Sequence, residues 1–547
     1  MNVLPTIIDK FCEFETSHAK KLFLAEPVKG QYQTFTWEEA GKQVRSMAAA
    51  LQNMGLGKDD KVAILSKNCA HWILADLAIS MAGCVSVPLY PNITPDALRE
   101  IIVHSESKAI FIGKLDNPEE LRKGVPDNLT RITFPFYPNL DCLNWNQLVA
   151  DNKGIVGKPI IDASSLSCIV YTSGTTGQPK GVMHTFNAVA FAVNSFLKSY
   201  PEIQNEVFFS YLPLCHVAER MLVECGTVFT GSTVFFVESM DTFAQNLAYT
   251  KPTVFLAVPR IWEKMQEGIQ KKMPQKKLNQ LLSIPIVSIL IKKTLRKKLG
   301  FQNSKLLFTG ASPINPALLK WYSKIGIVIQ EAYGMTENVA LSHSNRKGAV
   351  RFGTVGQAYE GVEVRLGKDN EVQVKSNASM IGYYKEPAIT EESFEDGFLR
   401  TGDEGSIDAD GYLTITGRIK DQFKTSKGKY IMPAPIESKF LQNPLIGQIC
   451  IVGSGMPNAM ALCTLSEFAK NQDHETVRKD LIELMATVNK ELEHHEQLIR
   501  LMIVPDEWTV ANGLLTPTMK IKRKMIDAAF EEKYEAWSKL PETIYFV

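Results

Sequence analysis

A polar loop rich in glycine and hydroxyl groups, with one lysine, offers the most specific chemistry in this sequence. The segment runs Ser167-Cys-Ile-Val-Tyr-Thr-Ser-Gly-Thr-Thr-Gly-Gln-Pro-Lys-Gly181, and its apolar first half is typical of a strand. Glycines let backbone N–H groups converge on an anion, hydroxyls add donors, and a lysine adds a mobile point charge. The predicted phosphate-binding residues are Thr172, Ser173, Gly174, Thr175, Thr176, Gly177 and Lys180.

This loop is not a Walker A motif. That motif requires a glycine directly followed by lysine and then Ser or Thr, whereas Gln178 and Pro179 separate Gly177 from Lys180 here. A flexible glycine turn is the alternative, but glycine, hydroxyls and lysine rarely coincide at this density in a plain turn. The composition therefore favours a phosphate site.

Four further motifs follow the phosphate loop: Tyr333-Gly-Met-Thr-Glu337, Thr401-Gly402-Asp403, Gly417-Arg-Ile-Lys-Asp421 and Thr516-Pro-Thr-Met-Lys520. The ordered set resembles the adenylate-forming superfamily, which comprises acyl-CoA synthetases, firefly-luciferase-like enzymes and peptide-synthetase adenylation domains. Within it, the segments YLPLCHVAER, AVPRIWEKM and KTSKGKYIMPAPIE look most like long-chain fatty acyl-CoA synthetases.

The resemblance implies roles for the first of these motifs. Tyr333 would offer an aromatic face to adenine, Thr336 a hydroxyl to the α-phosphate, and Glu337 a carboxylate to Mg²⁺, which prefers one or two carboxylates with phosphate oxygens. Without the phosphate loop, a buried tyrosine and a solvated glutamate would be the simpler interpretation. The implied adenine site comprises Gly310, Ala311, Ser312, Pro313, Glu331, Ala332, Tyr333 and Gly334.

The same resemblance implies a ribose site and a hinge. Asp403 has two acceptor oxygens in one plane, which suits the two ribose hydroxyls, although a turn aspartate after Gly402 would be unremarkable alone. Arg418 is expected nearby, in contact with ribose or phosphate. Lys420 matches the hinge position about which the small C-terminal domain of the family swings between two half-reactions.

Lys520 is the implied catalytic lysine, acting with Thr336 and Glu337. Its ammonium would neutralise the charge that builds up as a carboxylate meets the α-phosphate. The alternative is a solvated basic surface, because Lys522, Arg523 and Lys524 follow closely; the context Thr516-Pro-Thr favours Lys520.

His216 matches the position that lines the acyl entrance in related enzymes. An isolated histidine between apolar residues is as often a satisfied structural residue, so both interpretations stay open. Chain-length specificity depends on pocket depth, about which the spacing of residues says nothing.

Alternating helical and strand patterns predict an α/β scaffold for these residues. From Phe35 to Tyr90, the helical periodicity of TWEEAGKQVRSMAAALQNMG ends at Gly55, and the apolar runs KVAILS and CVSVPLY flank an Ala-rich helix. Similar strand-like runs recur at KAIFIG, SCIVYTSG, TVFLAV and SKLLFTGAS, and this alternation favours parallel strands. After about residue 350, VEVRLG, EVQVKS and GYLTITG predict short strands.

The expected fold is therefore α/β. A large N-terminal domain of α/β subdomains with a small β-barrel-like part would span residues 1–417 and carry the ATP and acyl sites. Residues 418–421 would form a hinge, with an ordinary surface loop as the alternative. Residues 422–547 would form a small, mobile α+β lid domain, since this length can build its own core.

Composition excludes several classes of protein. The chain has 547 residues, 45% of them hydrophobic, which is typical of a well-cored globular protein. Its formal charge of +1 gives no overall attraction to nucleic acid, so no nucleic-acid partner is expected. Nine cysteines without a CxxC pair argue against a disulfide framework or structural zinc, and a start without a signal-like pattern favours a cytoplasmic location.

The resemblance implies a two-step ligase that uses ATP with Mg²⁺, a fatty acid and coenzyme A. Acyl-AMP and pyrophosphate would form first, and the thiol of coenzyme A would then displace AMP. The alternatives are an acyl-AMP ligase serving a carrier protein, another carboxylate–CoA ligase, a luciferase-like oxygenase and a catalytically silent nucleotide- or lipid-binding protein. Carrier-dependent enzymes usually have an insertion that obstructs domain rotation, and residues 353–417 suggest none. A homodimer is left open.

Residues 271–298 combine nine Lys/Arg and no Asp or Glu with an apolar run from Leu281 to Ile291. Eleven residues interrupted by Pro285 are too short to span a bilayer. A buried helix with solvated ends, a lysine-rich connector, and peripheral contact with anionic lipid are the three interpretations that remain.

Overall fold

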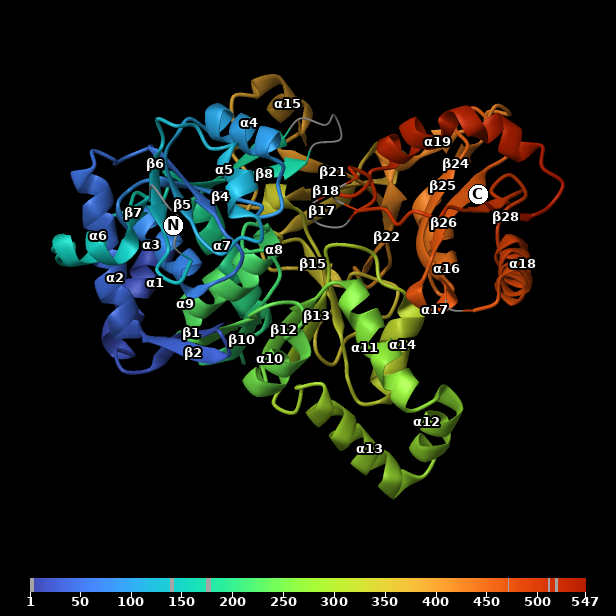
Figure 1. The fold of residues 1–547 in the computed structure, drawn as a ribbon, viewed down its shortest axis with the longest axis horizontal. Helices are drawn as coiled ribbons and strands as arrows, with labels where there is room; N and C mark the ends of the chain where they lie inside the picture. Colours follow the sequence, from blue (N-terminus) through green and yellow to red (C-terminus); the bar gives the residue numbers. More distant parts are fainter. Residues whose placement is uncertain (1–3, 138–141, 174–178, 471, 510–511, 517–519) are drawn as a thin grey trace. The chain divides into compact units, whose positions relative to one another are not determined.

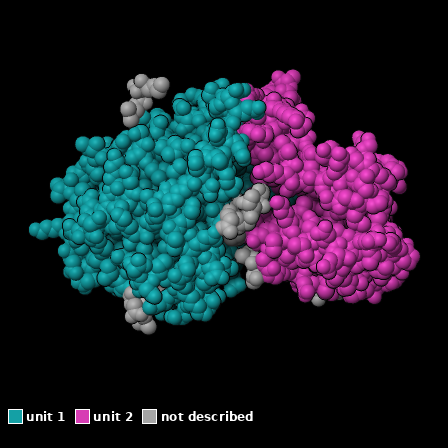
Figure 2. Space-filling view, turned by 90° about the horizontal axis from the view of Figure 1, so that it is seen from above, with its two compact units in different colours: residues 1–312, 318–364, 374–399 teal, residues 313–317, 365–373, 400–547 magenta. Residues whose placement is uncertain are grey.

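The computed structural model describes residues 4–137, 142–173, 179–470, 472–509, 512–516 and 520–547. The chain divides into two compact units (Figures 1 and 2). Unit 1 comprises residues 1–312, 318–364 and 374–399, and unit 2 comprises residues 313–317, 365–373 and 400–547. The predicted hinge lies inside unit 2, at the end of a strand, and its function stays a prediction.

The first sheet of unit 1 has eight strands in the order β19-β9-β8-β4-β3-β5-β6-β7. Its parallel centre is buried, as expected when helices cover both faces of a sheet. The helix–strand–helix–strand order predicted for residues 35–90 is confirmed as α2, β3, α3 and β4. The strands are β3 (Lys61–Leu65), β4 (Val85–Leu89), β5 (Ser107–Ile112), β6 (Thr130–Thr133), β7 (Leu143–Asn144), β8 (Leu166–Ser173), β9 (Pro179–Thr185) and β19 (Gly382–Tyr383).

The second sheet of unit 1 has nine strands in the order β16-β15-β14-β13-β12-β10-β11-β1-β2. Neighbours from β14 through to β1 are parallel, and the predicted strands in TVFLAV and SKLLFTGAS are confirmed as β12 and β13. The strands are β1 (Leu22–Val28), β2 (Gln31–Thr36), β10 (Val207–Ser210), β11 (Thr233–Phe236), β12 (Val254–Ala257), β13 (Leu306–Thr309), β14 (Gln330–Tyr333), β15 (His343–Ser344) and β16 (Gln357–Ala358).

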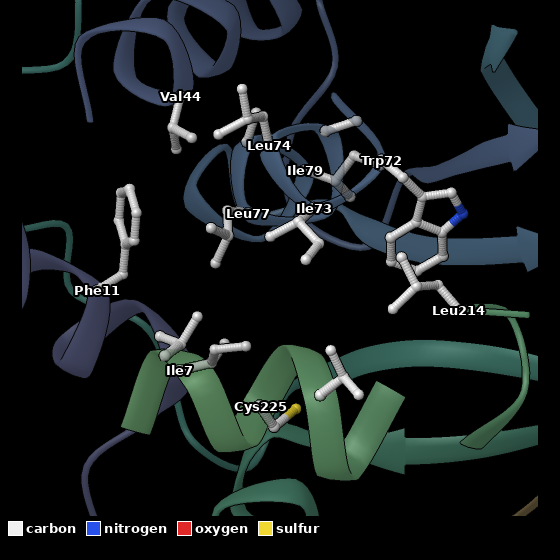
Figure 3. Close-up of a cluster of buried hydrophobic side chains, with 14 of the residues drawn as sticks. Ile7, Phe11, Val44, Trp72, Ile73, Leu74, Leu77, Ile79, Leu214 and Cys225 are labelled. Atoms are coloured by element: carbon white, nitrogen blue, oxygen red, sulfur yellow. The ribbon is translucent and has the colours of Figure 1, made fainter. Parts of the chain in front are cut away.

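Helices α1 (Ile7–Ser17), α2 (Trp37–Asn53) and α3 (Ala70–Met81) build much of the core of unit 1. Every residue of α3 is buried, and Figure 3 shows Ile73 and Leu77 of this helix near Phe11 of α1 and Val44 of α2. Each such buried side chain contributes about 1.5–3 kcal/mol relative to exposure. This packing fixes the scaffold from which the site residues project.

A third sheet has the order β17-β18-β21-β20, with β22 beside β21. It confirms the short strands predicted after residue 350, and the order of its elements contains no long insertion between residues 353 and 417. The strands are β17 (Glu363–Leu366), β18 (Glu371–Lys375), β20 (Phe394–Glu395), β21 (Phe398–Ile407) and β22 (Leu413–Arg418).

Unit 2 also contains a four-stranded sheet, β25-β26-β27-β28, with its own hydrophobic cores. Helices α16, α18 and α19 accompany it, so the α+β character predicted for the smaller C-terminal part is confirmed. These elements are β25 (Ile446–Val452), β26 (Met460–Leu465), β27 (Leu501–Ile503), β28 (Ile544–Phe546), α16 (Pro433–Phe440), α18 (His474–Lys490) and α19 (Arg523–Ser538), with a two-stranded ribbon of β23 (Phe423–Lys424) and β24 (Tyr430–Ile431).

The other helices lie on the loops between strands. They are α4 (Pro95–Ser105), α5 (Pro118–Arg122), α6 (Trp145–Asp151), α7 (Phe186–Ser199), α8 (Val217–Glu219), the π-helix η1 (Arg220–Cys225), α9 (Gly226–Thr230), α10 (Phe243–Thr250), α11 (Pro259–Lys272), α12 (Gln275–Leu282), α13 (Pro285–Lys298), α14 (Pro316–Lys324), α15 (Pro387–Glu392) and α17 (Glu467–Lys470). In the described part of the chain, no helix is both long and apolar enough to cross a membrane, and the nine cysteines are free thiols.

Candidate active site

The phosphate loop of the sequence connects two paired strands of unit 1. β8 and β9 are antiparallel, and their register places Thr172 opposite Lys180 and Ser173 opposite Pro179. The two described ends of the loop therefore face each other. Gly174, Thr175, Thr176 and Gly177 lie outside the described residues, and so does the side chain of Ser173.

Tyr383 joins the phosphate-loop lysine to the predicted metal-binding carboxylate. Strand β19 pairs with β9, and the Lys180 ammonium lies 5.5 Å from the centre of the Tyr383 ring. The Tyr383 hydroxyl donates a hydrogen bond of 2.7 Å to Glu337 Oε1. Burial, and then the negative charge of Glu337, raise the pKa of Tyr383, so this hydroxyl keeps its proton. Tyr383 was not predicted from the sequence; the aromatic pair after Gly382 is the one signal that marks it.

Thr336 and Glu337 lie in a short 3-10 turn, η2 (Thr336–Asn338), after β14. The Thr336 carbonyl accepts a 2.7 Å hydrogen bond from His184 Nε2, and the Met380 N–H donates at 2.7 Å to the Glu337 carbonyl. Burial lowers the pKa of His184 to about 4, so its ring is neutral and Nε2 carries the proton. The His184 side chain, on β9, and the backbone N–H of Met380, before β19, thus hold the turn, and His184 was not predicted from the sequence.

The backbone before and after this turn approaches itself closely. A Cβ on Gly334 would lie 2.4 Å from the carbonyl carbon of Ala340, so only glycine fits there. Val339 and Ala340 have φ values of +53° and +57°, a left-handed conformation that costs roughly 1–3 kcal/mol for such residues. The turn that presents Glu337 is therefore strained, which is typical of functional sites.

The two segments predicted to line the adenine site are neighbours. β13 and β14 are parallel, with Thr309 opposite Glu331. Residues 310–312, which follow β13, therefore lie beside residues 332–334 at the end of β14. A Cβ on Gly310 would lie 2.9 Å from the Ala332 carbonyl oxygen. Gly310, Ala311, Ser312, Glu331, Ala332, Tyr333 and Gly334 all belong to unit 1, whereas Pro313 belongs to unit 2.

A small apolar cavity of about 20 Å³ lies inside unit 1. The π-helix η1 lines one side of it, and π-helical turns are frequent at functional sites. A cavity of this size holds about one water-sized group, so an acyl chain would need side chains to move. Its lining residues are Cys168, Val170, His184, Val189, Val217, Arg220, Met221, Cys225 and Val339. A more open depression of about 480 Å³, between α1 and α7, contains none of the predicted residues.

His216 precedes the short helix α8 beside the small cavity lined by η1. Its Nδ1 accepts a 3.2 Å hydrogen bond from the Ala218 N–H, which is the N-capping role of a structural residue. Val217, the next residue, lines the cavity. The two interpretations of His216 are therefore compatible, since a capping histidine can still stand at the entrance.

A buried network of charges holds η1 against α3. Arg220 pairs with Asp76 at 2.6 Å and with Glu224 at 3.3 Å, and the Ser86 hydroxyl donates to Asp76. Burial raises the pKa of Glu219 to about 8, although Ser210 and Tyr211 donate hydrogen bonds to its carboxylate. These charges pair behind the cavity and anchor its wall, although Arg220 Nη1 and both carboxylate oxygens of Glu224 make no hydrogen bond within the described part of the chain.

In unit 2, the predicted ribose residues Asp403 and Arg418 are in contact. They are cross-strand partners of β21 and β22, and Arg418 Nε lies 2.9 Å from Asp403 Oδ1. The Asp403 side chain is buried, whereas about half of the Arg418 side chain is exposed. Lys420 follows on an exposed turn, η4 (Ile419–Asp421).

Lys520 of unit 2 is bonded to Thr516 through its backbone. Its N–H donates a 3.0 Å bond to the Thr516 hydroxyl, and its carbonyl accepts a 2.8 Å bond from the Thr516 N–H. Lys520 is exposed, whereas Arg523 of the same basic run pairs with Glu437 at 2.7 Å and is half-buried. The basic run is therefore not a uniform solvated surface.

Comparison with known sequences decides the family. The model of "AMP-binding enzyme" matches residues 14–384, more than half of the chain. The chain belongs to the AMP-binding enzyme family. A second model, "AMP-binding enzyme C-terminal domain", matches residues 420–538. The resemblance inferred from the five motifs is thereby confirmed, and the protein is an enzyme.

Two curated relatives match most of the chain, and a solved structure has a similar fold. The long-chain-fatty-acid–CoA ligase FadD15 of Mycobacterium bovis is 29% identical, with 93% of each chain covered. Long-chain-fatty-acid–CoA ligase 5 of Mus musculus is 29% identical over 92% of this chain and 84% of its own. The fold is similar to the anthranilate CoA ligase AuaEII in complex with anthranoyl-AMP, with a TM-score of 0.81, 19% identity and coverage of 98% and 99% of the two chains.

The donor set near Glu337 fits Mg²⁺ that arrives with a nucleotide. Among the residues that the structure describes, no group of three or more His, Cys, Asp and Glu side chains could hold a metal ion by itself. Mg²⁺ commonly takes only one or two carboxylates and completes its shell with phosphate oxygens and water. The partly exposed Glu337 carboxylate, near the phosphate-loop lysine, is a suitable single ligand.

Proposed function

We propose that this enzyme activates a long-chain fatty acid with ATP and transfers the acyl group to coenzyme A. The observation that carries the proposal is the arrangement of Lys180, Tyr383 and Glu337: one tyrosine side chain meets the Lys180 ammonium with its ring and the Glu337 carboxylate with its hydroxyl. Family membership supports the adenylation chemistry. The names of the mycobacterial and mouse relatives support the fatty acid as substrate and coenzyme A as acceptor.

In the first half-reaction, a carboxylate oxygen of the fatty acid attacks the α-phosphorus of ATP, and the bond to pyrophosphate breaks. The residues at the ends of the phosphate loop, Thr172 and Lys180, would hold the departing phosphates, and Thr336 would donate to the α-phosphate. Glu337 would hold Mg²⁺, which spreads the phosphate charge when bound. Lys520 would offset the charge of two anions that approach each other.

In the second half-reaction, the thiol of coenzyme A gives up its proton to water, its sulfur attacks the acyl carbonyl carbon, and AMP leaves with the electrons of the broken C–O bond. Asp403 and Arg418 would hold the ribose, so that the nucleotide keeps its position through both steps. Lys420 would serve as the hinge about which the small C-terminal domain turns between the two half-reactions, so that different side chains of that domain face the acyl-AMP in each step. Both roles rest on the family resemblance.

The acyl chain would enter beside His216 and extend into the cavity lined by η1. Since the cavity holds about 20 Å³, Met221 and Cys225 would have to move to admit a long chain. Flexible methionine suits this task, because its unbranched side chain repacks easily. We also expect a cytoplasmic location and contact with a membrane through residues 271–298.

Pyrophosphate release with saturated carboxylates of 2 to 18 carbons, with and without coenzyme A, tests the proposal. Release that increases with chain length, together with acyl-CoA formation, is the expected result. If acyl-AMP accumulates and its acyl group is transferred only to an acyl carrier protein, the acceptor is a carrier protein and not coenzyme A. Binding of nucleotide or fatty acid without pyrophosphate release from any carboxylate would refute the ligase activity.

A further inference from the structure

Helices α12 and α13 form a basic helical hairpin, residues 275–298, at the periphery of unit 1. Figure 1 shows them at the lower edge of the view, beyond α11 and α14 and away from both large sheets. The two helices contact each other, and Ser283 and Ile284 form the short connection between them. The hairpin is therefore helical and peripheral, and the interpretation as a lysine-rich connector between α/β units stays open.

Large apolar side chains of this hairpin are exposed to water. The exposed fractions are 51% for Ile284, 75% for Ile286, 69% for Ile289 and 60% for Leu290. In α13 the last three have i, i+3 and i+4 spacing, so they share one face of the helix. Ser288 and Leu295, on another face, are buried and attach α13 to the protein. The buried-helix interpretation of this segment is thus wrong for its apolar outer face.

The same face continues into exposed lysines. Lys293 and Lys297 follow Ile286, Ile289 and Leu290 at helical spacing, and Lys298 is also exposed. The described residues include no acidic partner for any of the hairpin lysines. Arg296 differs from them, because its guanidinium donates hydrogen bonds to the carbonyls of Phe301, Ser304 and Gly326. Arg296 is therefore part of the fold, and the lysines form the accessible positive charge.

We propose that the outer face of α13, with Ile284 before it, docks on the surface of an anionic lipid bilayer. The apolar side chains would enter the boundary between headgroups and acyl chains, and Lys293, Lys297 and Lys298 would contact lipid phosphates. A helix of 14 residues that lies in this plane presents both kinds of group at once. The proposed function gives the contact a purpose, since long-chain fatty acids reside mainly in membranes, but the docking surface itself rests on the geometry alone.

Two other occupants fit this face less well. A nucleic acid would neutralise the lysines but offers no apolar phase to four exposed aliphatic side chains. A second copy of the chain would bring an equally basic hairpin against this one, and like charges oppose that contact. An anionic bilayer complements both the charge and the apolar surface.

Co-sedimentation with phosphatidylcholine vesicles that contain 30% phosphatidylglycerol tests the proposal, with the full chain and no substrate. The charge variant is Lys293→Gln, Lys297→Gln and Lys298→Gln, and the apolar variant is Ile286→Gln, Ile289→Gln and Leu290→Gln. Each should weaken binding roughly a hundredfold, since every lysine near a charged bilayer contributes about a factor of five and every inserted aliphatic side chain at least as much. Salt at 0.5 M should release the wild-type protein.

Control variants elsewhere on unit 1 change three charges, as the charge variant does, or two apolar groups. Lys29→Gln, Lys153→Gln and Lys347→Gln remove three exposed lysines, and Val156→Gln with Ile160→Gln replaces two side chains that are 96% and 99% exposed. These controls should bind vesicles as the wild type does. If the controls lose as much binding as the variants, the effect does not depend on the α13 face, and the proposal is overturned.

Other results would also overturn it. If only the charge variant loses binding, and heparin competes, the face binds polyanions. If size-exclusion chromatography shows a dimer that the apolar variant dissociates, the occupant is a second copy. Pyrophosphate release from soluble octanoate should be the same in the wild type and both variants. Absence of pyrophosphate release from every acid of the 2- to 18-carbon series in the wild type would count against the proposed function, whereas vesicle binding would still report on the docking surface.

Discussion

The hydroxyl of Tyr383 provides a direct test of the site, because Tyr383→Phe removes one oxygen and keeps the ring. The ring faces the Lys180 ammonium at 5.5 Å, and the hydroxyl donates to Glu337 at 2.7 Å. The variant thus separates the cation–π contact from the hydrogen bond to the carboxylate. Tyr383 is a positioning residue in this view, since it acts through Glu337.

The size of the effect follows from the charge of the acceptor. A hydrogen bond to a charged group is worth about 1.5–3 kcal/mol, which corresponds to a loss of about 10- to 150-fold in kcat/KM for adenylation. We also expect the apparent affinity for Mg²⁺ to fall, because the carboxylate loses the donor that fixes its orientation. The neighbour Tyr384 supplies a matched control: its hydroxyl donates at 2.7 Å to the exposed Glu106, and Tyr384→Phe should change adenylation less than twofold.

Pyrophosphate exchange over a range of Mg²⁺ concentrations measures both quantities, and circular dichroism after urea titration checks that the variants fold. Glu337→Gln should reduce adenylation and raise the Mg²⁺ requirement on its own. Since the two residues act as a pair, the double variant should lose less than the product of the single losses. Additive losses, or a Tyr383→Phe variant that behaves as Tyr384→Phe does, would refute the link between the two residues.

Three further predictions concern other parts of the protein. Lys520→Ala should abolish adenylation but leave thioester formation from supplied acyl-AMP, whereas Lys524→Ala should affect neither; equal loss in both half-reactions would refute the assigned role. In the native protein the Glu219 carboxyl holds its proton to about pH 8, whereas in the unfolded chain it loses the proton near pH 4.5. The free energy of unfolding therefore falls as pH rises through this window, by at most about 1.4 kcal/mol per pH unit. Glu219→Gln should flatten this dependence, as urea titrations at several pH values would measure. Met221→Ala should enlarge the cavity and shift kcat/KM toward bulkier acyl chains by roughly tenfold, measured over a series of acids; an unchanged preference would separate the cavity from the acyl site.

The order of helices and strands could be predicted from the sequence because local signals specify it. The capping box of Thr36 and Glu39 begins α2, and Gly55, with a φ of +82°, follows its end, as the periodicity of the segment predicts. The chemistry of the phosphate loop was also local, since glycine, hydroxyl groups and lysine lie within a few residues. Each of these features depends on neighbours in the chain.

The tertiary structure decided which of these groups meet. Tyr383 reaches Lys180 and Glu337 only because β19 pairs with β9, and no local pattern encodes a pairing between strands about 200 residues apart. The fold likewise pairs Arg523 with Glu437 but leaves Lys520 of the same basic run exposed. It also exposes apolar side chains of α13 to water, although the sequence of this segment is equally typical of a core helix. Charge and hydrophobicity are properties of the sequence, whereas partner and exposure are set by the fold, because contacts between distant segments determine them.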